Sequence, residues 1–329
     1  MPHTPPAGSL PPLFNPSNDL ALAANTSNYI PPRLVQAMEQ DLQPVTRLWD
    51  HGPWGWSLNT RRRYLDMGIA PERLPSDSWL ERHRQLSSRA TDAAYIQALM
   101  REDWGNHLAG HHMQTVDLAG FESMQSRRET SVGLIYKAPW SSSGKGNLPA
   151  VNGLLPDDAR RVRNILGHDG FILVDRFYPD KVVDFSMEFD IRPEGKSRFL
   201  GYSMFLTAER GRYGGQKVAS QEQLLQWIGA DRGLLGELVS YHLLHLPRLG
   251  YTGPMGIDMM RLSDGRLHPV VELNLRRNMG ILAIEVEHRH PGIRNMELTP
   301  RGNHGFQMVI EDGLLKIINL NVGNPSNPN

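Results

Sequence analysis

The chain has 329 residues, 40% of them hydrophobic, and its 35 Lys and Arg residues balance 35 Asp and Glu residues. This length suits about two domains, each with a sizeable core. A net charge of zero gives no electrostatic support for nucleic-acid binding, and the absence of cysteine excludes a disulfide framework and thiolate chemistry.

The first residues, 1–12, are rich in proline and are expected to be a flexible N-terminus. They have neither the basic region nor the apolar core of a signal peptide, and no apolar run approaches the ~20 residues of a membrane span. We therefore expect a cytoplasmic protein without a membrane segment. Residues 322–329, VGNPSNPN, are expected to form a flexible tail.

Residues 13–105 alternate short apolar runs with helical patterns, which favours a small N-terminal α/β domain. One strand is expected to begin at Leu13 and a second to cover Val45–Trp49. The helical patterns cover Pro31–Gln40, Asn59–Gly68 and Ser88–Arg101.

A Gly/Ser-rich loop, KAPWSSSGKGN, follows an apolar strand that ends at Lys137. Small residues let successive backbone N–H groups approach phosphate oxygens closely. The loop is not a Walker A motif, because Pro139 stands where that motif needs Gly and Gly146 stands where it needs Ser or Thr. Taken alone, the loop fits a flexible surface loop at least as well as a phosphate site.

A second strand over Gly170–Phe177 leads into a segment in which acidic and polar residues alternate with apolar ones. This alternation, from Asp184 to Ile191, predicts a strand with one wet face. Phe199–Thr207 is a further strand, and residues 208–220 are expected to be a loop. The basic and aromatic residues gathered in that loop are Arg210, Arg212, Tyr213 and Lys217.

The most informative stretch is a predicted hairpin, with strands over Met255–Leu262 and Leu267–Asn274 around an Asp-Gly turn. Asp258 lies on the first strand, and Glu272 and Asn274 lie two residues apart on the second, so these two share a face. Oxygen ligands on one face suit a hard cation such as Mg²⁺, with Mn²⁺ as an alternative. An ordinary hairpin with a solvated polar face is the competing interpretation.

Successive side chains of a strand point to alternate faces, so the register of the hairpin decides whether Asp258 lies on that face. A two-residue loop would send Glu272 to the opposite side of the sheet from Asp258. A three-residue loop, 263–265, pairs Leu262 with Arg266, places Asp258 opposite Val270, and brings all three side chains to one face. A bulge elsewhere, for example at Pro269, would also restore the parity. We therefore predict one of these two devices.

The three stretches, in this order, resemble the ATP-grasp superfamily, which includes D-alanine–D-alanine ligase, biotin carboxylase and glutathione synthetase. The resemblance spans Lys137 to Gly280. It implies an α/β (α+β) class with an ATP-grasp domain over 106–321 that contains a lid subdomain at about 130–177, after the N-terminal α/β domain. The adenine hinge would lie at Asp175 to Tyr178, although the family usually has Glu at the position of Asp175.

The resemblance also assigns roles to single residues. Arg276 would stabilise charge on the transferring phosphoryl or acyl-phosphate group, and Asp184 would hold the ribose. Lys217, by weak preference over its neighbours in the loop, would contact the terminal phosphate or the acidic substrate. Metal ligands would be Asp258, Glu272 and Asn274. The ATP-binding set would be Lys137, Ser142, Ser143, Gly144, Lys145, Gly146, Asp175, Arg176, Phe177 and Asp184.

The activity implied is that of an ATP- and Mg²⁺-dependent carboxylate–amine ligase that forms an acyl phosphate and releases ADP and phosphate. Its partners would be a small-molecule carboxylate and an amine, with neither nucleic acid nor membrane involved, and a homodimer is allowed. Two alternatives stay open. One is an ATP-grasp kinase that phosphorylates a small-molecule hydroxyl, and the other is a catalytically inactive ATP-binding regulatory protein.

Overall fold

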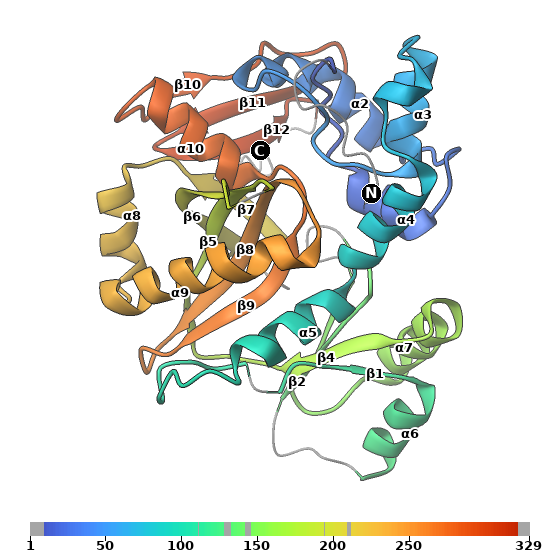
Figure 1. The fold of residues 1–329 in the computed structure, drawn as a ribbon, viewed down its shortest axis with the longest axis vertical. Helices are drawn as coiled ribbons and strands as arrows, with labels where there is room; N and C mark the ends of the chain where they lie inside the picture. The colour runs from blue at the N-terminus through green and yellow to red at the C-terminus, as the bar shows by residue number, and fades with distance from the viewer. Residues whose placement is uncertain are drawn as a thin grey trace, which may run out of the picture.

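Two antiparallel sheets of unequal size form the centre of the molecule (Figure 1). The computed structural model describes residues 10–110, 112–127, 133–141, 146–193, 195–208 and 212–321. The mixed α/β (α+β) class expected from the sequence is confirmed. Helix α5, Arg89–Leu99, runs between the two sheets and contacts strands of both.

The larger sheet has eight strands in the order β10-β11-β12-β7-β6-β5-β8-β9. Its central strand, β5, pairs with both β6 and β8, and β9 forms one edge. Part of the expected loop over 208–220 is in fact strand β7. The strands are β5 Lys181–Ile191, β6 Arg198–Ala208, β7 Arg212–Lys217, β8 Gly253–Leu262, β9 Leu267–Asn274, β10 Met296–Glu297, β11 Phe306–Glu311 and β12 Leu314–Asn319.

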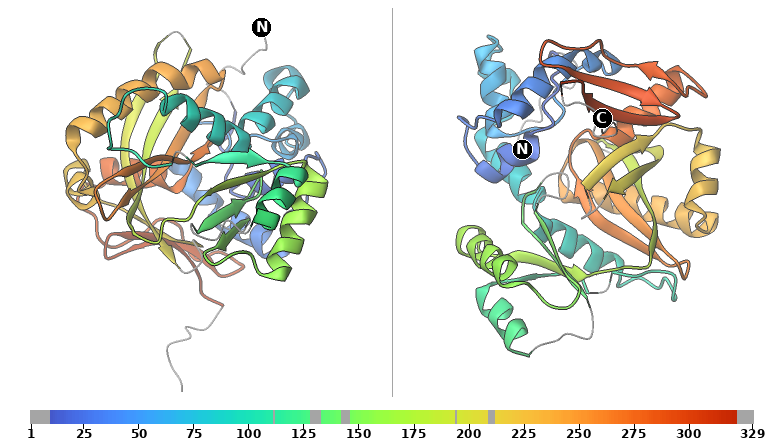
Figure 2. Two further views of the ribbon diagram at one scale, coloured as in Figure 1. Left: turned by 90° about the horizontal axis from the view of Figure 1, so that it is seen from below. Right: turned by 180° about the vertical axis from the view of Figure 1, so that it is seen from behind.

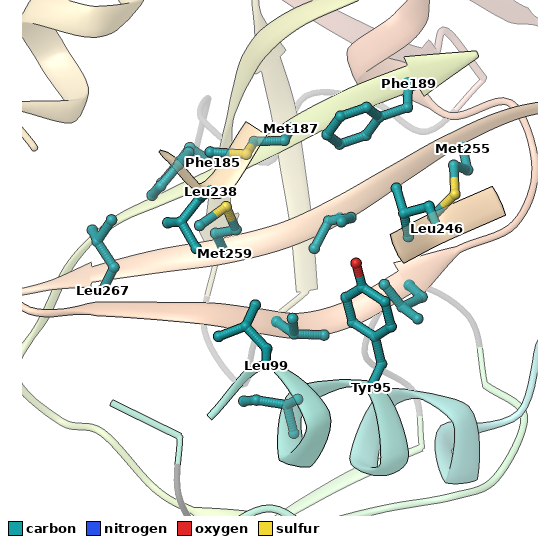
Figure 3. Close-up of a cluster of buried hydrophobic side chains, with 14 of the residues drawn as sticks. Tyr95, Leu99, Phe185, Met187, Phe189, Leu238, Leu246, Met255, Met259 and Leu267 are labelled. Atoms are coloured by element: carbon teal, nitrogen blue, oxygen red, sulfur yellow. The ribbon is translucent and has the colours of Figure 1, made fainter. Parts of the chain in front are cut away.

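One face of this sheet is apolar and packs against α8, Gln221–Ile228, and α9, Arg232–His245. The alternation read from the sequence is confirmed, because Phe185, Met187 and Phe189 of β5 are fully buried in this core. Figure 3 shows them with Leu238 of α9 and with Tyr95 and Leu99 of α5. The opposite face of β5 carries the polar side chains.

The smaller sheet has the order β1-β4-β2-β3 and a core of its own, which includes Phe121, Tyr136 and Val162. Two helices, α6 (Leu118–Arg127) and α7 (Pro156–Asp169), pack on the side away from α5 (Figure 2). The strands are β1 Gln114–Val116, β2 Leu134–Lys137, β3 Asn147–Ala150 and β4 Ile172–Arg176. This unit covers the expected lid subdomain.

The N-terminal region does not form the two strands predicted for it. Within residues 10–105 the structure has helices, and the segment expected to be a strand at Val45–Trp49 is instead a 3-10 helix over Gln43–Leu48. Leu13 makes only an isolated bridge to Pro53. Pro44 fixes its own φ and lacks an N–H, which favours a tight helical turn over a paired strand. Besides α5, the α-helices are α1 Asn18–Ala24, α2 Arg33–Leu42, α3 Leu58–Asp66 and α4 Asp77–Leu86, and a short 3-10 turn covers Pro71–Arg73.

The C-terminal part adds helix α10, Met279–Arg289, and strands β10 to β12, which complete the larger sheet. Helix α10 packs on the polar side of the sheet, against β6 and β7. A further 3-10 turn, Leu246–Leu249, joins α9 to β8. In the described part of the chain, no helix combines the length and apolar character needed to cross a bilayer.

The hairpin has the predicted three-residue loop and, in addition, a register shift of two residues that leaves the parity unchanged. Leu262 N donates to Arg266 O at 2.9 Å around a three-residue loop, in which Gly265 has φ +88°, a region that glycine enters easily. A register shift then follows between Asp258 and Met260. Asp258 therefore pairs with Glu272 and not with Val270, and the two acids share a face as predicted.

The outer edge of β9 is covered along its length. Leu273 N donates to Asp92 of α5 at 3.0 Å, and Val271 O accepts from the Lys137 ammonium at 3.4 Å. At the other end, Leu267 bonds through its N–H and its carbonyl to the backbone of His107 and Ala109. Helix α5 and the smaller sheet therefore dock on the strand that carries Glu272.

Replacing Leu238 with alanine should destabilise the protein, because this side chain of α9 is fully buried between the helix and the sheet. We expect a loss of about 2–5 kcal/mol in the free energy of unfolding, measured by urea titration. Leu244→Ala on the same helix removes the same atoms from a side chain that is 59% exposed, and should stay within about 0.5 kcal/mol of wild type. Equal losses in the two variants would contradict this core assignment.

Candidate active site

The polar face of the larger sheet is built from rows of paired residues across β5, β8 and β9. One row contains Ser186, Asp258 and Glu272, and the next contains Glu188, Gly256 and Asn274. Because directly paired residues point to the same face, the three predicted metal ligands lie together. Helix α10 and the N-terminal helices border this face (Figure 1).

The two acids of the first row repel one another. Burial, and after it the charge of Glu272, raise the pKa of Asp258 to about 7, although bonds from Ser186 and Asn274 act to lower it. The Ser186 hydroxyl donates to Asp258 Oδ1 at 2.7 Å. Two carboxylates and an amide oxygen are donors that suit Mg²⁺. Among the residues described, no group of three or more His, Cys, Asp or Glu side chains is placed to hold a metal, so a site here depends on Asn274.

Arg89, at the start of α5, is a residue that the sequence did not single out. Its guanidinium is buried and contacts Glu272 Oε2 at 2.9 Å and Asp92 Oδ2 at 3.2 Å. Its backbone N–H donates to Pro139 O at 3.0 Å. Arg89 thus joins a predicted metal ligand to the base of the Gly/Ser-rich loop. The only local signal was an Arg and an Asp three residues apart at a helix start.

Lys137, at the end of β2, is buried beside β9. Burial lowers its pKa, while the neighbouring Asp175 carboxylate, 3.9 Å from the ammonium, raises it. Asp175 also accepts from Arg176 N at 2.7 Å and contacts His268 Nε2 at 3.0 Å. Although burial raises the pKa of Asp175, the charges and bonds of His268 and Lys137 bring it below its ordinary value. The Lys137 ammonium therefore lies where the two sheets meet.

The other residues assigned to the nucleotide are placed unevenly. Asp184 is on the polar face, but its carboxylate already accepts from Lys181 and from Thr207 Oγ1. Arg176 is exposed and Phe177 half-buried, with Phe177 N bonded to Gly133 O at 2.8 Å. Gly146 accepts from Ala138 N at 3.1 Å across the base of the loop. Ser142, Ser143, Gly144 and Lys145 lie outside the described residues, as does Arg210.

The two residues assigned to catalysis lie on different sides of the sheet. Arg276 follows the end of β9 and lines a pocket together with Glu272 and Asn274. Lys217 is not brought to this site. Its neighbour Gln216 pairs with Phe205 on the polar face, so Lys217 points to the other side, where its ammonium lies 5.9 Å from the ring of Trp227.

Glu188 is a second residue that the sequence read only as one polar position in an alternating strand. It is 1% exposed, and its carboxylate accepts from Ser203 Oγ at 2.8 Å and from Asn278 Nδ2 at 2.7 Å. Asn278 also caps the start of α10 by accepting from Ile281 N. A side chain at Gly280 would collide with this carboxylate, so glycine is needed there. Glu188 thus holds α10 against the polar face.

The strand that ends at Lys137, the end of β4 at Asp175 and the hairpin with two acids and an amide therefore meet between two antiparallel sheets. These are the stretches that carry the resemblance read from the sequence. Searches against family profiles and against curated proteins find no match.

Solved structures do show partial similarity. They include N5-carboxyaminoimidazole ribonucleotide synthetase from Thermus thermophilus (13% identity, 84% of this chain and 77% of that chain, TM-score 0.48). A biotin carboxylase complex from Campylobacter jejuni matches at 12% identity (71% and 53%, TM-score 0.49). D-alanyl-alanine synthetase A from Vibrio cholerae matches at 10% (64% and 62%, TM-score 0.42). In several of these matches the chain spans only about half to two thirds of the length of the solved chain, for example 47% of a 2-oxoglutarate carboxylase domain from Hydrogenobacter thermophilus.

The stability of the protein should depend on Glu188 in a pH-dependent way. Burial raises its pKa from 4.5 to about 8, so the folded chain holds this proton more tightly than the unfolded chain. The stabilisation that protonation provides is complete below about pH 4.5 and is lost as the pH rises through about 8. Glu188→Gln has no proton to lose, so its stability relative to wild type should increase across this window.

Urea unfolding at the two ends of that window measures the effect. Glu237→Gln is the control, because it changes a glutamate on the exposed side of α9. If the difference in stability between wild type and Glu188→Gln is the same at the low-pH and high-pH ends of the window, the Glu188 proton is not coupled to folding.

Proposed function

We propose that the protein is an ATP-dependent carboxylate–amine ligase of the ATP-grasp type. The observation that carries this proposal is the cluster of Asp258, Glu272 and Asn274 on one sheet face, with three largely buried cations nearby. Glu272 contacts Arg89, Val271 on the same strand contacts Lys137, and Arg276 follows two residues after Asn274. Phosphoryl transfer depends mainly on positioning and on neutralisation of charge, which is what such a cluster supplies.

The donor set fits a magnesium ion. Asp258, Glu272 and Asn274 would hold it, and burial together with the Glu272 charge raises the pKa of Asp258, so a cation would be favourable beside this pair. When bound, such an ion neutralises phosphate oxygens and fixes their orientation. Glu272 Oε2 is already bonded to Arg89, which orients the carboxylate and leaves its other oxygen for a ligand.

The chemistry needs no protein nucleophile. An oxygen of the substrate carboxylate forms a bond to the γ-phosphorus of ATP while the bond to the β–γ bridging oxygen breaks, which gives an acyl phosphate and ADP. The amine nitrogen then attacks the acyl carbon, phosphate leaves with its electron pair, and the nitrogen loses a proton. The side chains of Lys137, Arg89 and Arg276 would offset charge on the phosphates and on the acyl phosphate.

The decisive experiment measures ADP release from Mg-ATP with pools of carboxylic acids and amino acids, with and without an added amine. We expect release that requires an acid and rises with the amine, and Glu272→Gln should fold normally by circular dichroism yet lose this turnover. Release that needs a hydroxyl compound and no acid would favour the kinase. Nucleotide binding without turnover in any pool would favour the inactive regulatory protein.

Lys137→Ala should weaken ATP binding by about ten- to a hundred-fold, because a charge-assisted bond to phosphate contributes roughly 1.5–3 kcal/mol. Calorimetric titration with Mg-ATP measures this affinity. Lys316→Ala is the control, since that lysine is paired with Glu311 at the surface on β12. Equal affinities of wild type and Lys137→Ala would remove Lys137 from the site.

A further inference from the structure

His268 of β9 is a fully buried histidine on the polar face of the larger sheet. It pairs across the hairpin with Met260 of β8, which pairs in turn with Asp184 of β5. Because directly paired residues point to the same face, His268 belongs to the row that contains Asp184. Its strand is the edge on which the smaller sheet docks, so this imidazole lies between the two sheets.

The imidazole of His268 is held on several sides. Its Nε2 lies 3.0 Å from Asp175 Oδ2, and its ring packs edge-on to Tyr178, with 5.4 Å between the ring centroids. Gly110 approaches so closely that a Cβ there would come within 2.9 Å of Nε2. Nδ1 has no hydrogen-bond partner among the described residues. Since a carboxylate can only accept, Nε2 carries a proton and donates it to Asp175.

Asp175 and Lys137 share one face of the smaller sheet. Asp175 pairs with Ile135, which precedes Lys137 by two residues on β2, so both side chains point away from the core of this sheet and toward β9. The Asp175 carboxylate accepts from Arg176 N through Oδ1 at 2.7 Å, and its Oδ2 faces both His268 and Lys137. Both carboxylate oxygens are therefore engaged within the protein.

The Lys137 ammonium is held loosely by comparison. It lies 3.9 Å from Asp175 Oδ2, which is too far for a hydrogen bond, and 3.4 Å from Val271 O. An ammonium group has three N–H donors. Within the described part of the chain, Lys137 therefore makes a single hydrogen bond and keeps two donors for a ligand.

The bond from His268 accounts for this open ion pair. The carboxylate oxygen that faces Lys137 is the one that His268 already occupies, at 3.0 Å against 3.9 Å for the lysine. Without that donor, the buried carboxylate would gain by closing on the ammonium, because an unpaired buried charge is costly. A tight pair of Asp175 with Lys137 would then take up donors that a phosphate group needs.

We propose that His268 is a positioning residue for nucleotide binding, which fixes the Asp175 carboxylate so that Lys137 keeps its charge and its free donors for the phosphates. This inference rests on the nucleotide site of the proposed function, and it deepens that proposal by adding a residue that acts through Lys137. It also gives Asp175 the task of holding a lysine.

Calorimetric titration with Mg-ATP provides the first test. His268→Leu removes the donor and should weaken binding by about five- to ten-fold, the upper part of the range that a single hydrogen bond contributes. In a Lys137→Ala background the same change should alter the affinity by less than about twofold, because His268 acts only through Lys137.

Further variants separate positioning from packing. His268→Gln keeps an N–H donor for Asp175 and should retain most of the affinity. His268→Phe keeps a planar ring without the donor, should match His268→Leu, and replaces it if that variant does not fold by circular dichroism. His242→Leu is the control and should bind Mg-ATP as wild type does. His242 is also fully buried, with one ring nitrogen 2.9 Å from Tyr95 Oη, but it belongs to α9 on the apolar side of the sheet.

A second test follows the imidazole itself. The Nε2 signal of His268, assigned by its loss in His268→Gln, is recorded by NMR while Mg-pyrophosphate is added, with Mg-ADP as a second probe. We expect a saturable shift with pyrophosphate in wild type that is absent in Lys137→Ala, because coupling between two positions is reciprocal.

The outcomes separate this inference from the ligase. Non-additive losses of affinity without acid-dependent ADP release would contradict the ligase and leave the role of His268 in place. Additive losses, a wild-type affinity in both His268→Leu and His268→Phe, or a His268 signal that neither probe moves would overturn the role of His268, whatever the turnover. Absence of Mg-ATP binding by the wild type would overturn both.

Discussion

Repulsion between Asp258 and Glu272 is the constraint around which the molecule is arranged. Direct pairing across β8 and β9 holds the two carboxylates side by side on a partly buried face. Like charges in such a position are costly unless neighbours compensate for them. The compensation comes from groups outside the hairpin: the Ser186 hydroxyl on β5, the guanidinium of Arg89 on α5 and, more distantly, Arg276.

Those compensating groups explain how the parts of the chain are joined. Arg89 links α5 to β9 and reaches the base of the Gly/Ser-rich loop, and Lys137 links the smaller sheet to the same strand. Asp19 performs the equivalent task for the N-terminal helices by pairing with Arg276. Helix α5, the smaller sheet and the N-terminal helices therefore each contribute one charged side chain that contacts β9 or the residues just after it.

The sequence predicts well what depends on neighbours along the chain. Alternation located β5, the Asp-Gly turn located the hairpin, and parity placed Asp258 and Glu272 on one face before the register was known. The prediction of Val270 as the partner of Asp258 was wrong, because a register shift beyond the three-residue loop moves the pairing by two residues. Parity survives a shift of two, which is why the conclusion about the shared face held.

What the sequence could not predict depends on contacts distant in the chain. No local pattern connects Asp19 with Arg276 or Arg89 with Glu272, and the side on which Lys217 lies is decided by the pairing of β6 with β7. The prediction of a strand at Val45–Trp49 was wrong for a related reason. Its apolar residues are buried by packing against α10 and the β11–β12 hairpin, without any strand partner to complete a sheet.

The covered edge of β9 has a consequence for the protein's behaviour in concentrated solution. An exposed, apolar edge strand is a template on which other chains can add and aggregate. Here the backbone groups that would invite such pairing are occupied by Asp92, Lys137 and residues 107–109. The side chains that assemble the candidate active site therefore also protect the chain from self-association, and selection for either property would preserve both.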